Sequence, residues 1–248
     1  MQLRTLGRDC LILNWVVPIA GLPPAPAGLE YAVASSAGAD RVLASLALFR
    51  QRILQLPGVS IPKVSFPQLT VRVCVLDAEG VASFFVPALK VPAWVLPTMK
   101  LVAPRSARMA TFDVPPSGSM PGDEPLRWRV RGRGALEVAV CAGARWDPVE
   151  PDLGGFEGVV RYVQRRRRWY LPASEGVRRL EIEATASRPL PLRAEVREAG
   201  LVAATLELTD EPAGPELHSA WYVPEVPFVL TTGRESKGVL PESLPAPG

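Results

Sequence analysis

The segment Ser65-Phe-Pro-Gln-Leu-Thr-Val-Arg-Val-Cys-Val-Leu76 decides the fold class of this chain. Side chains alternate along it, with Leu69, Val71, Val73 and Val75 on one face and Gln68, Thr70, Arg72 and Cys74 on the other. A period of two predicts a β-strand. Asp77-Ala-Glu-Gly80 supplies a hairpin loop, so we expect residues 81–86 to return as the partner strand.

The rest of the chain has the same character. We predict a second hairpin over Leu126 to Ala142, with Arg127, Arg129, Arg131 and Arg133 on one face, and a short helix over residues 155–164. Residues 41–56 fit a helix or a strand, because their apolar run is ambiguous in period. The segment from 88 to 103 carries Pro92 and Pro97, which limit any helix to a short or kinked one. Further strands are predicted over residues 10–17, 178–186, 192–196, 201–207 and 220–230.

Composition sets the broad class. The 248 residues are 48% hydrophobic and 21% charged, which is typical of a globular chain, and 27 prolines argue against long helices and repeat solenoids. The net charge of +3 is too small to indicate a nucleic-acid partner. We therefore predict one antiparallel-rich α+β domain over residues 1–235, followed by a loose C-terminal tail over residues 236–248.

Cysteine usage and hydropathy indicate the setting. Cys10, Cys74 and Cys141 are widely spaced, and His218 is the only histidine, so we expect reduced thiols, no metal site and no cofactor. The apolar run from 10 to 20 is interrupted by Asn14 and Pro18 and lacks the features of a signal peptide. No apolar span reaches the length of a membrane helix. The expected location is the cytoplasm.

A family resemblance covers nearly the whole chain in order. The segment Ser65–Arg72 resembles the pattern SFPELNVRTYV of the bacterial YqjF-like family, a domain of unknown function that is similar to acetoacetate decarboxylase. Shorter matches to the family lie at residues 9–15, 22–30, 80–86, 104–109, 156–168, 180–183 together with 189–191, and 217–219. The resemblance implies a strongly curved antiparallel β-sheet that forms a cone or barrel around a central pocket, with a few short helices, within a homo-oligomer.

The same resemblance bears on chemistry. The resemblance implies the chemistry of active decarboxylases of this kind, which form a Schiff base on one lysine while a neighbouring lysine keeps its amine neutral; acetoacetate decarboxylase is the standard example of a lysine activated in this way. If Pro104 matches the proline before that pair, Arg105 and Ser106 replace the two lysines, and neither can form an imine. The pocket glutamate of the family corresponds to Gln68 here.

Several residues are candidates for binding a ligand. Arg72 would hold a carboxylate if its face lines the pocket; the alternative is a solvent-facing arginine or a structural ion pair with Asp77 or Glu79. Arg105 and Arg108 would add to such an anion site. Lys100 is the best remaining amine, although a surface lysine is the simpler interpretation, and Lys90 is a weaker candidate.

Two further features have a functional and a plain interpretation. His218 is a candidate general base, but without an identified partner it also fits a structural role. The run from Arg165 to Arg168, followed by Trp169 and Tyr170, fits either a nucleic-acid or lipid contact or a solvated face.

The leading hypothesis is a cytoplasmic protein that binds a small organic acid or carbonyl compound and lacks Schiff-base decarboxylation. One alternative is an enzyme that performs acid–base chemistry on a carbonyl or carboxylate compound in the same pocket, through Arg72, Lys100 or His218. A second alternative is a nucleic-acid or membrane-surface accessory protein that acts through Arg165–Arg168.

Overall fold

The computed structural model describes residues 2–35, 40–55, 64–143, 155–185, 188–208 and 216–236. Its strands are β1 (Gln2–Pro18), β2 (Leu29–Tyr31), β3 (Val33–Ser35), β4 (Arg41–Gln55), β5 (Ser65–Asp77), β6 (Ala82–Val91), β7 (Ala107–Met109), β8 (Thr111–Asp113), β9 (Leu126–Gly132), β10 (Gly134–Ala142), β11 (Arg168–Pro172), β12 (Val177–Ala184), β13 (Leu190–Glu198) and β14 (Glu216–Ser236). Its helices are α1 (Leu96–Val102), α2 (Gly155–Gln164) and α3 (Gly200–Leu206), with a 3-10 turn, η1, at Ile19–Gly21.

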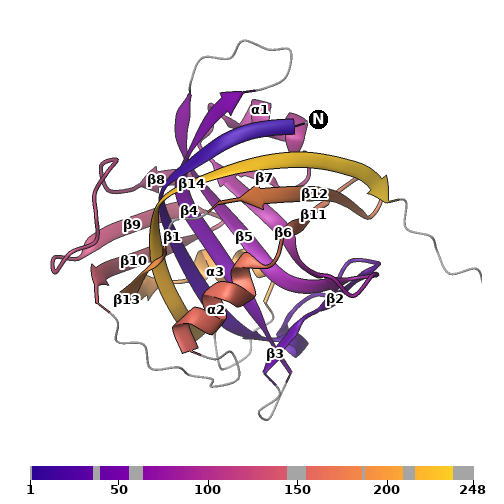
Figure 1. Ribbon diagram of the computed structural model, residues 1–248, viewed down its shortest axis with the longest axis horizontal. Helices are drawn as coiled ribbons and strands as arrows, with labels where there is room; N and C mark the ends of the chain where they lie inside the picture. Colours follow the sequence, from indigo (N-terminus) through magenta and orange to yellow (C-terminus); the bar gives the residue numbers. More distant parts are fainter. Residues whose placement is uncertain are drawn as a thin grey trace, which may run out of the picture.

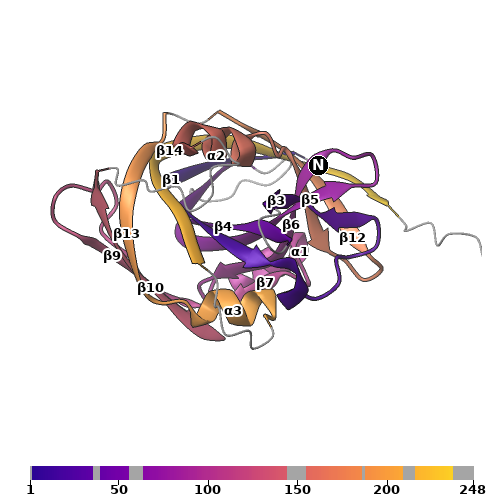
Figure 2. The same cartoon turned by 90° about the horizontal axis from the view of Figure 1, so that it is seen from below.

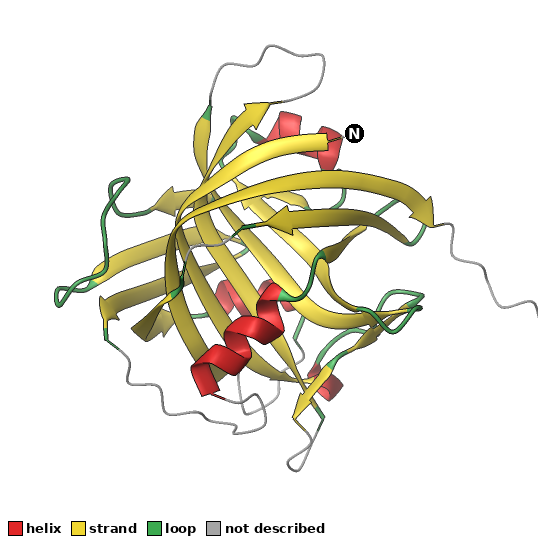
Figure 3. Cartoon of the chain, viewed as in Figure 1, coloured by secondary structure: helices red, strands yellow, loops and turns green. Residues whose placement is uncertain are grey.

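One 14-stranded sheet organises the molecule (Figures 1 and 3). Its order is β1-β4-β5-β6-β11-β12-β14-β13-β10-β9-β8, and β14 also pairs with β1. Most pairs are antiparallel, whereas β6 runs parallel to β11 and to β7. The path continues past β14 into β13 and β10, so the architecture is a strongly curved mixed sheet and not a simple closed barrel (Figure 2). This confirms the predicted curved sheet with few helices.

The curvature begins in β1, which pairs with β4 on one side and with β14 on the other. The β1–β4 register shifts between Arg8 and Leu11, around Asp9, whose φ is +52°. The β1–β14 register shifts between Asn14 and Trp15. Such irregularities bend and twist a strand, so they help the sheet to fold back on itself.

The core lies on both faces of the central strands. In β5 the predicted outer residues Leu69 and Val71 are fully buried, and so are Thr70 and Cys74 on the opposite face. Helix α2 covers the concave face, where Phe156 packs edge-on against Trp221. Helix α3 contacts β10, β9 and β6 on the other side of the sheet, and Figure 2 shows the two helices apart.

Most local predictions agree with this structure. The first hairpin is β5–β6, the second is β9–β10, and residues 155–164 form α2. The ambiguous segment 41–56 is the strand β4, and the proline-limited segment contains only the short helix α1. The predicted tail lies outside the described residues from 237 onward.

One predicted strand is wrong. The sequence predicts a strand over residues 201–207, but in the structure these residues belong to helix α3 and the residue that follows it. Leu201, Val202 and Leu206 are buried on one side of this helix, and Glu207 ends it in a left-handed conformation. A run of seven residues is too short for its period to separate a strand from a helix, so packing on β10 decides.

Asp77 joins the first hairpin to β11. Its carboxylate accepts hydrogen bonds from the backbone N–H groups of Glu79 (3.0 Å) and Val81 (2.9 Å) within the turn. It also accepts hydrogen bonds from Arg168 (2.9 Å) and from the Tyr170 hydroxyl (3.0 Å) in β11. Burial alone would raise the pKa of Asp77, but these hydrogen bonds outweigh it and hold the pKa below its usual value.

We expect Asp77→Asn to lower the free energy of unfolding by about 2 kcal/mol at neutral pH, since an amide cannot replace the charged acceptor. Because the folded pKa of Asp77 is depressed, its contribution is present above the unfolded value of about 3.9 and is lost as the pH falls through the folded value. Urea unfolding from pH 7 to pH 2.5 should therefore show the wild type and the variant converging in acid. A difference that is independent of pH would contradict the assignment.

Gly134 sets the distance between the β9–β10 hairpin and helix α3. Its φ is +83°, and a Cβ at this position would lie 2.6 Å from the backbone oxygen of Gly200. Only glycine permits both the conformation and the approach. The contact holds Arg133, in the hairpin turn, on the same side of the sheet as α3.

We expect Gly134→Ala to destabilise the protein more than Gly28→Ala. Gly28 has nearly the same φ, +81°, but open space around its Cβ position, so it is a matched control for backbone strain alone. The control should cost about 1 kcal/mol, and the Gly134 variant about 1–3 kcal/mol more because it also clashes with backbone. Equal losses in chemical unfolding would show that α3 shifts freely away from the hairpin.

Candidate functional site

The concave side of the sheet encloses a cavity of about 270 Å³, called here the Arg72 cavity. Strands β1, β5, β6, β11, β12 and β14 all contribute to its wall, and residues of α2 and the segment after it cover it. Its lining residues are Ile12, Arg72, Phe84, Val163, Gln164, Arg166, Arg167, Trp169, Ile182, Ala184, Trp221, Val223 and Val226. None of these thirteen side chains is acidic.

Arg72 is the charged group at the centre of this wall. Arg72 is only 8% exposed. The central carbon of its guanidinium lies 4.7 Å from the centre of the Phe84 ring and 5.6 Å from the centre of the Trp169 ring. One nitrogen donates to Ser45 Oγ (2.7 Å), while Nε has no partner among the described residues. Burial lowers the pKa of Arg72 to about 10. The ion pairs with Asp77 or Glu79 that the sequence left open are not formed, since those carboxylates bind Arg168.

A second buried arginine lies beside the first. Arg166 is 5% exposed, stacks over the Tyr162 ring at 3.8 Å and lies 5.8 Å from the Phe84 ring. It donates a short hydrogen bond to the carbonyl oxygen of Tyr162. With Arg167, which also lines the cavity, three arginines and no carboxylate surround one volume, an arrangement that favours an anionic ligand.

Buried polar side chains continue from Arg72 across the neighbouring strands and form a polar row. Ser45 pairs in register with Arg72, Asn14 pairs with Ser45, and Ser219 pairs with Asn14. Asn14 donates to Ser219 Oγ (3.0 Å), and its own oxygen has no partner among the described residues. Unmatched buried polar atoms are costly, so the polar row is suited to complete its hydrogen bonds with a ligand or water.

His218 stands at the far end of the polar row. Its Nδ1 lies 3.3 Å from Ser219 Oγ, and the side chain is buried. Burial lowers the pKa of His218, with a smaller opposing effect of Glu216, which favours the neutral imidazole at neutral pH. The ring can therefore accept a proton, but it does not line the Arg72 cavity.

Gln68 faces the same concave side near its other end. It lines a smaller, mainly apolar cavity of about 60 Å³, together with residues of α1 such as Met99. Its Nε2 donates to Thr70 Oγ1 (3.1 Å). Trp169 lines both cavities, so the two cavities are neighbours.

The remaining sequence candidates lie elsewhere. Lys100 is exposed on α1, and Arg105 and Arg108 line a groove on the opposite side of the sheet. Ser106, in contrast, is fully buried and donates to the carbonyl oxygen of Val86 (3.3 Å). The structure therefore does not bring Arg105, Arg108 or Lys100 together with Arg72.

The run from Arg165 to Arg168 is not a continuous basic surface. Arg166 is buried in the Arg72 cavity, and Arg168 binds Asp77 (2.9 Å) and Glu79 (2.6 Å). Only Arg165 and Arg167 are exposed. In the described part of the chain, no helix is long and apolar enough to cross a membrane, and no three His, Cys, Asp or Glu side chains gather as a metal site would require.

Comparison with solved structures places this geometry in a known architecture. The chain superposes on an acetoacetate decarboxylase-like enzyme from Sphingomonas wittichii RW1 with a TM-score of 0.57 and 12% identity, covering 94% of this chain and 92% of that one. The chain has an acetoacetate-decarboxylase-like fold. The enduracididine biosynthesis enzyme MppR, with HEPES buffer bound, matches with a TM-score of 0.55 and 12% identity over 96% of this chain and 88% of its own.

MppR complexed with pyruvate matches with a TM-score of 0.52 and 14% identity, over 94% of this chain and 89% of that one. No family model matches the sequence, and no curated protein matches it. The decarboxylase-like similarity predicted from the sequence is thus confirmed at the level of the fold. The YqjF-like assignment stays a prediction.

Sequence reasoning found Arg72 and Gln68 through strand alternation but missed two other parts of this site. Arg166 sat within an arginine run that gave no sign of which member is buried. Ser45, Asn14 and Ser219 meet only through pairing of strands far apart in the chain. A polar residue within an apolar run, such as Asn14 in residues 10–17, was the available signal.

We expect Arg72→Met to stabilise the ligand-free protein. A buried charge without an acidic partner carries a desolvation cost of several kcal/mol, which the Ser45 hydrogen bond and the aromatic rings only partly offset. A rise in melting temperature of about 2–4 °C corresponds to about 1 kcal/mol in a chain of this size. Lys100→Met, at an exposed site, is the control and should change little; a large loss of stability in the Arg72 variant would contradict this account.

Proposed function

We propose that this protein binds a small organic carboxylate in the Arg72 cavity and does so without forming a Schiff base. The single observation that supports the proposal most strongly is Arg72 itself, a buried guanidinium that faces a 270 Å³ cavity and has no acidic partner among the described residues. A ligand carboxylate would take two of its donors in the fork geometry that arginine offers.

The cost of burying Arg72 also supports a ligand. Burying the unpaired guanidinium costs several kcal/mol of desolvation free energy. An anion that enters the cavity offsets part of this cost, so anionic ligands bind more favourably there than neutral ones. Arg166 contributes a second positive charge, and Phe84, Trp169 and Trp221 exclude water around it. The related MppR, which has been seen complexed with pyruvate, suggests a ligand of about that size.

The placement of the amines supports binding without an imine. Arg105 and Ser106 occupy the positions where the resemblance expects the lysine pair, and Lys100 is exposed on α1. Lys90 points to the other side of the sheet. Lys63 and Lys237 lie outside the described residues. Within the described ranges, no lysine lines the Arg72 cavity or the Gln68 cavity.

The proposal includes the setting of the protein. The three cysteines are buried and free, which supports a reducing compartment such as the cytoplasm. We also propose that residues 1–235 act as one domain and that the chain assembles into a homo-oligomer, as the family resemblance implies.

The test is the binding of pyruvate measured by isothermal titration calorimetry. We expect binding to the wild type and a loss of about 2 kcal/mol, or roughly 30-fold in affinity, in Arg72→Met, because truncation removes a desolvated charge partner. Lys100→Met is the matched control and should bind as the wild type does. Equal affinity in both variants would refute the Arg72 cavity as the binding site.

Borohydride reduction separates this function from Schiff-base chemistry. Incubation with pyruvate or acetoacetate and borohydride should leave no adduct on Lys63, Lys90, Lys100 or Lys237 in intact-mass measurements. A stoichiometric adduct on any of these lysines would overturn the proposal that the protein works without an imine.

Acid–base catalysis by His218 is a second candidate function. It is favoured by the 3.3 Å contact of the ring with Ser219 and by the polar row that leads from Ser219 to Arg72. A neutral histidine would accept a proton from a ligand held by Arg72. Exchange of the methyl protons of pyruvate for deuterium, lost in His218→Gln but with binding retained, would select this function over binding alone.

A further inference from the structure

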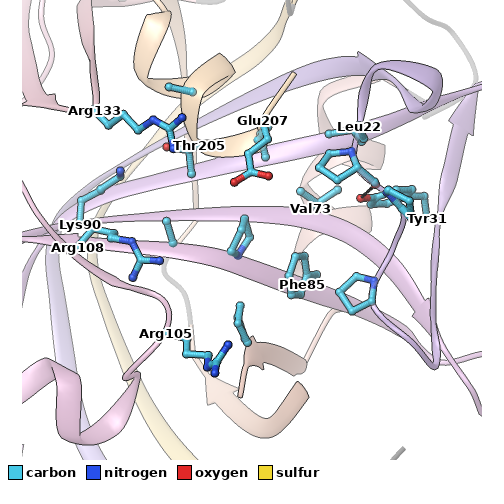
Figure 4. Close-up of a pocket in the computed structure, with 18 of the residues that line it drawn as sticks. Leu22, Tyr31, Val73, Phe85, Lys90, Arg105, Arg108, Arg133, Thr205 and Glu207 are labelled. Atoms are coloured by element: carbon cyan, nitrogen blue, oxygen red, sulfur yellow. Dashed lines mark hydrogen bonds between the residues drawn. The ribbon is translucent and has the colours of Figure 1, made fainter. Parts of the chain in front are cut away.

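A second cavity, called here the outer groove, lies on the side of the sheet opposite the Arg72 cavity. Its volume is about 740 Å³. It is bounded by the face of β5 and β6, the segment after α1, the loop that precedes β2, and the end of α3. Figure 4 shows Lys90, Arg108 and Arg133 gathered at one end, and Leu22, Tyr31, Val73 and Phe85 at the other.

The sheet itself separates the two cavities. Arg72 and Val73 are neighbours in β5, so their side chains point to opposite faces, and Val73 lines the outer groove while Arg72 lines the Arg72 cavity. Phe85 pairs in register with Val73, and Lys90 pairs with Leu69 on the same face. A ligand in one cavity therefore does not touch the other.

Lys90 is the central residue of the cationic end. It is only 4% exposed, and within the described residues it makes no hydrogen bond and no ion pair. Arg108 lies opposite it in the β6–β7 pairing. Burial, followed by the charges of Arg108 and Arg133, lowers the pKa of Lys90. A buried ammonium group between two like charges is an unfavourable arrangement unless an anion occupies the space between them.

The other cations of the groove are also uncompensated. Arg105 and Arg133 form no ion pair in the described part of the structure, and Arg108 donates only to the carbonyl oxygen of Ala107 (3.1 Å). Glu207 is the one acidic side chain among the lining residues. Figure 4 shows it on the α3 side of the groove, between the cationic and the apolar ends.

We propose that the outer groove binds a phosphate monoester with an apolar body. The phosphate lies among Lys90, Arg108 and Arg133, and the body extends over Val73 and Phe85 toward Tyr31. A dianionic phosphate matches several cations with its three terminal oxygens, whereas a carboxylate carries one charge and two oxygens. Glu207, beside the body, disfavours a second anionic group there and can accept a hydrogen bond from a hydroxyl or amino group.

The contact between Gly134 and α3 preorganises this site. Arg133 lies in the hairpin turn that ends at Gly134, and Thr205 and Glu207 lie at the end of α3. The backbone approach of Gly134 to Gly200 fixes these two elements relative to each other. The groove therefore has one wall that is held in place without a ligand, which reduces the ordering cost of binding.

Phenyl phosphate is the probe, titrated into the full-length protein by calorimetry at low ionic strength. We expect Lys90→Met and Arg133→Gln each to weaken its binding at least 10-fold. Arg127→Gln is the matched control, because Arg127 is exposed on the same hairpin and does not line the groove, so it should bind as the wild type does. Arg72→Met should also bind normally, which separates this site from the carboxylate site of the proposed function.

Three comparisons decide the ligand class. Inorganic phosphate should bind at least 10-fold more weakly than phenyl phosphate, and benzoate should likewise be weaker; equal affinity of either one would overturn the assignment. A loss of affinity in Arg127→Gln equal to that in Lys90→Met would show nonspecific charge attraction and would overturn the assignment.

A second copy of the chain is the other possible occupant of the groove. In that case Phe85→Asp would convert a dimer into a monomer in light scattering, and phenyl phosphate would not bind the dimer; this outcome would also overturn the assignment.

Thermal unfolding shows whether the variants are folded, so that a loss of binding can be assigned to the removed side chain. Lys90→Met replaces a buried charge with an apolar side chain of similar length, and Arg133→Gln changes an exposed turn residue, so both should unfold cooperatively. Phenyl phosphate should raise the melting temperature of the wild type and of Arg127→Gln progressively, with the logarithm of its concentration once that exceeds the Kd, but not that of Lys90→Met. A ligand-induced shift retained in Lys90→Met would contradict the proposal.

Discussion

The pairing of β1 with β14 is the constraint on which the rest of the structure depends. It joins Gln2 to Thr231 and continues to Val16 and Glu216, so almost the whole length of the chain separates the partners. Two side-chain contacts reinforce it, because Asn14 binds Ser219 (3.0 Å) and the Tyr222 hydroxyl donates to Asp9 (3.1 Å). Ordering so distant a pair costs chain entropy, which the burial of Leu11, Leu13 and their neighbours must offset.

Curvature follows from this pairing, and curvature gives the two faces of the sheet different roles. On the concave face, side chains converge from six strands, so a small number of polar groups can surround one volume. On the convex face they diverge, and the outer groove forms where α3 and the loop before β2 stand away from β5 and β6. Positive side chains outnumber carboxylates in both linings, since the Arg72 cavity has no acidic lining residue and the outer groove has Glu207 against four cations.

The positions of the amines have a consequence for chemistry. An imine-forming lysine must be both neutral and beside its substrate. Lys90 has a depressed pKa but faces the outer groove, where arginines surround it, whereas the concave face presents Arg72 and Arg166. Within the described residues the Arg72 cavity is therefore lined by arginines and by no lysine. Guanidinium groups bind carboxylates well and do not form imines, which is why we propose that this cavity binds a carboxylate without covalent chemistry.

Local patterns in the sequence determined a substantial part of this protein. The alternation from Gln68 to Cys74, the hairpin at Asp77–Gly80 and the helix at 155–164 depend on side-chain period and turn residues, which are short-range properties. The curved sheet followed from a resemblance spread over the chain. The presence of Arg105 and Ser106, and of no lysine at either position, is likewise read directly from the sequence.

Tertiary structure alone decided the rest. Residues 41–55 form a strand and residues 200–206 form a helix. The spacing of apolar residues in these short segments does not specify either outcome, so packing against the neighbouring elements decides it. A sequence cannot say which face of a strand is concave, so it grouped Arg105 and Arg108 with Arg72 although the sheet lies between them. It likewise passed over the burial of Lys90 and the row from Ser219 to Arg72. Those arrangements arise from the register of strands distant in sequence, and register is fixed by the burial of one face against the rest of the fold, which a single strand's sequence does not reveal.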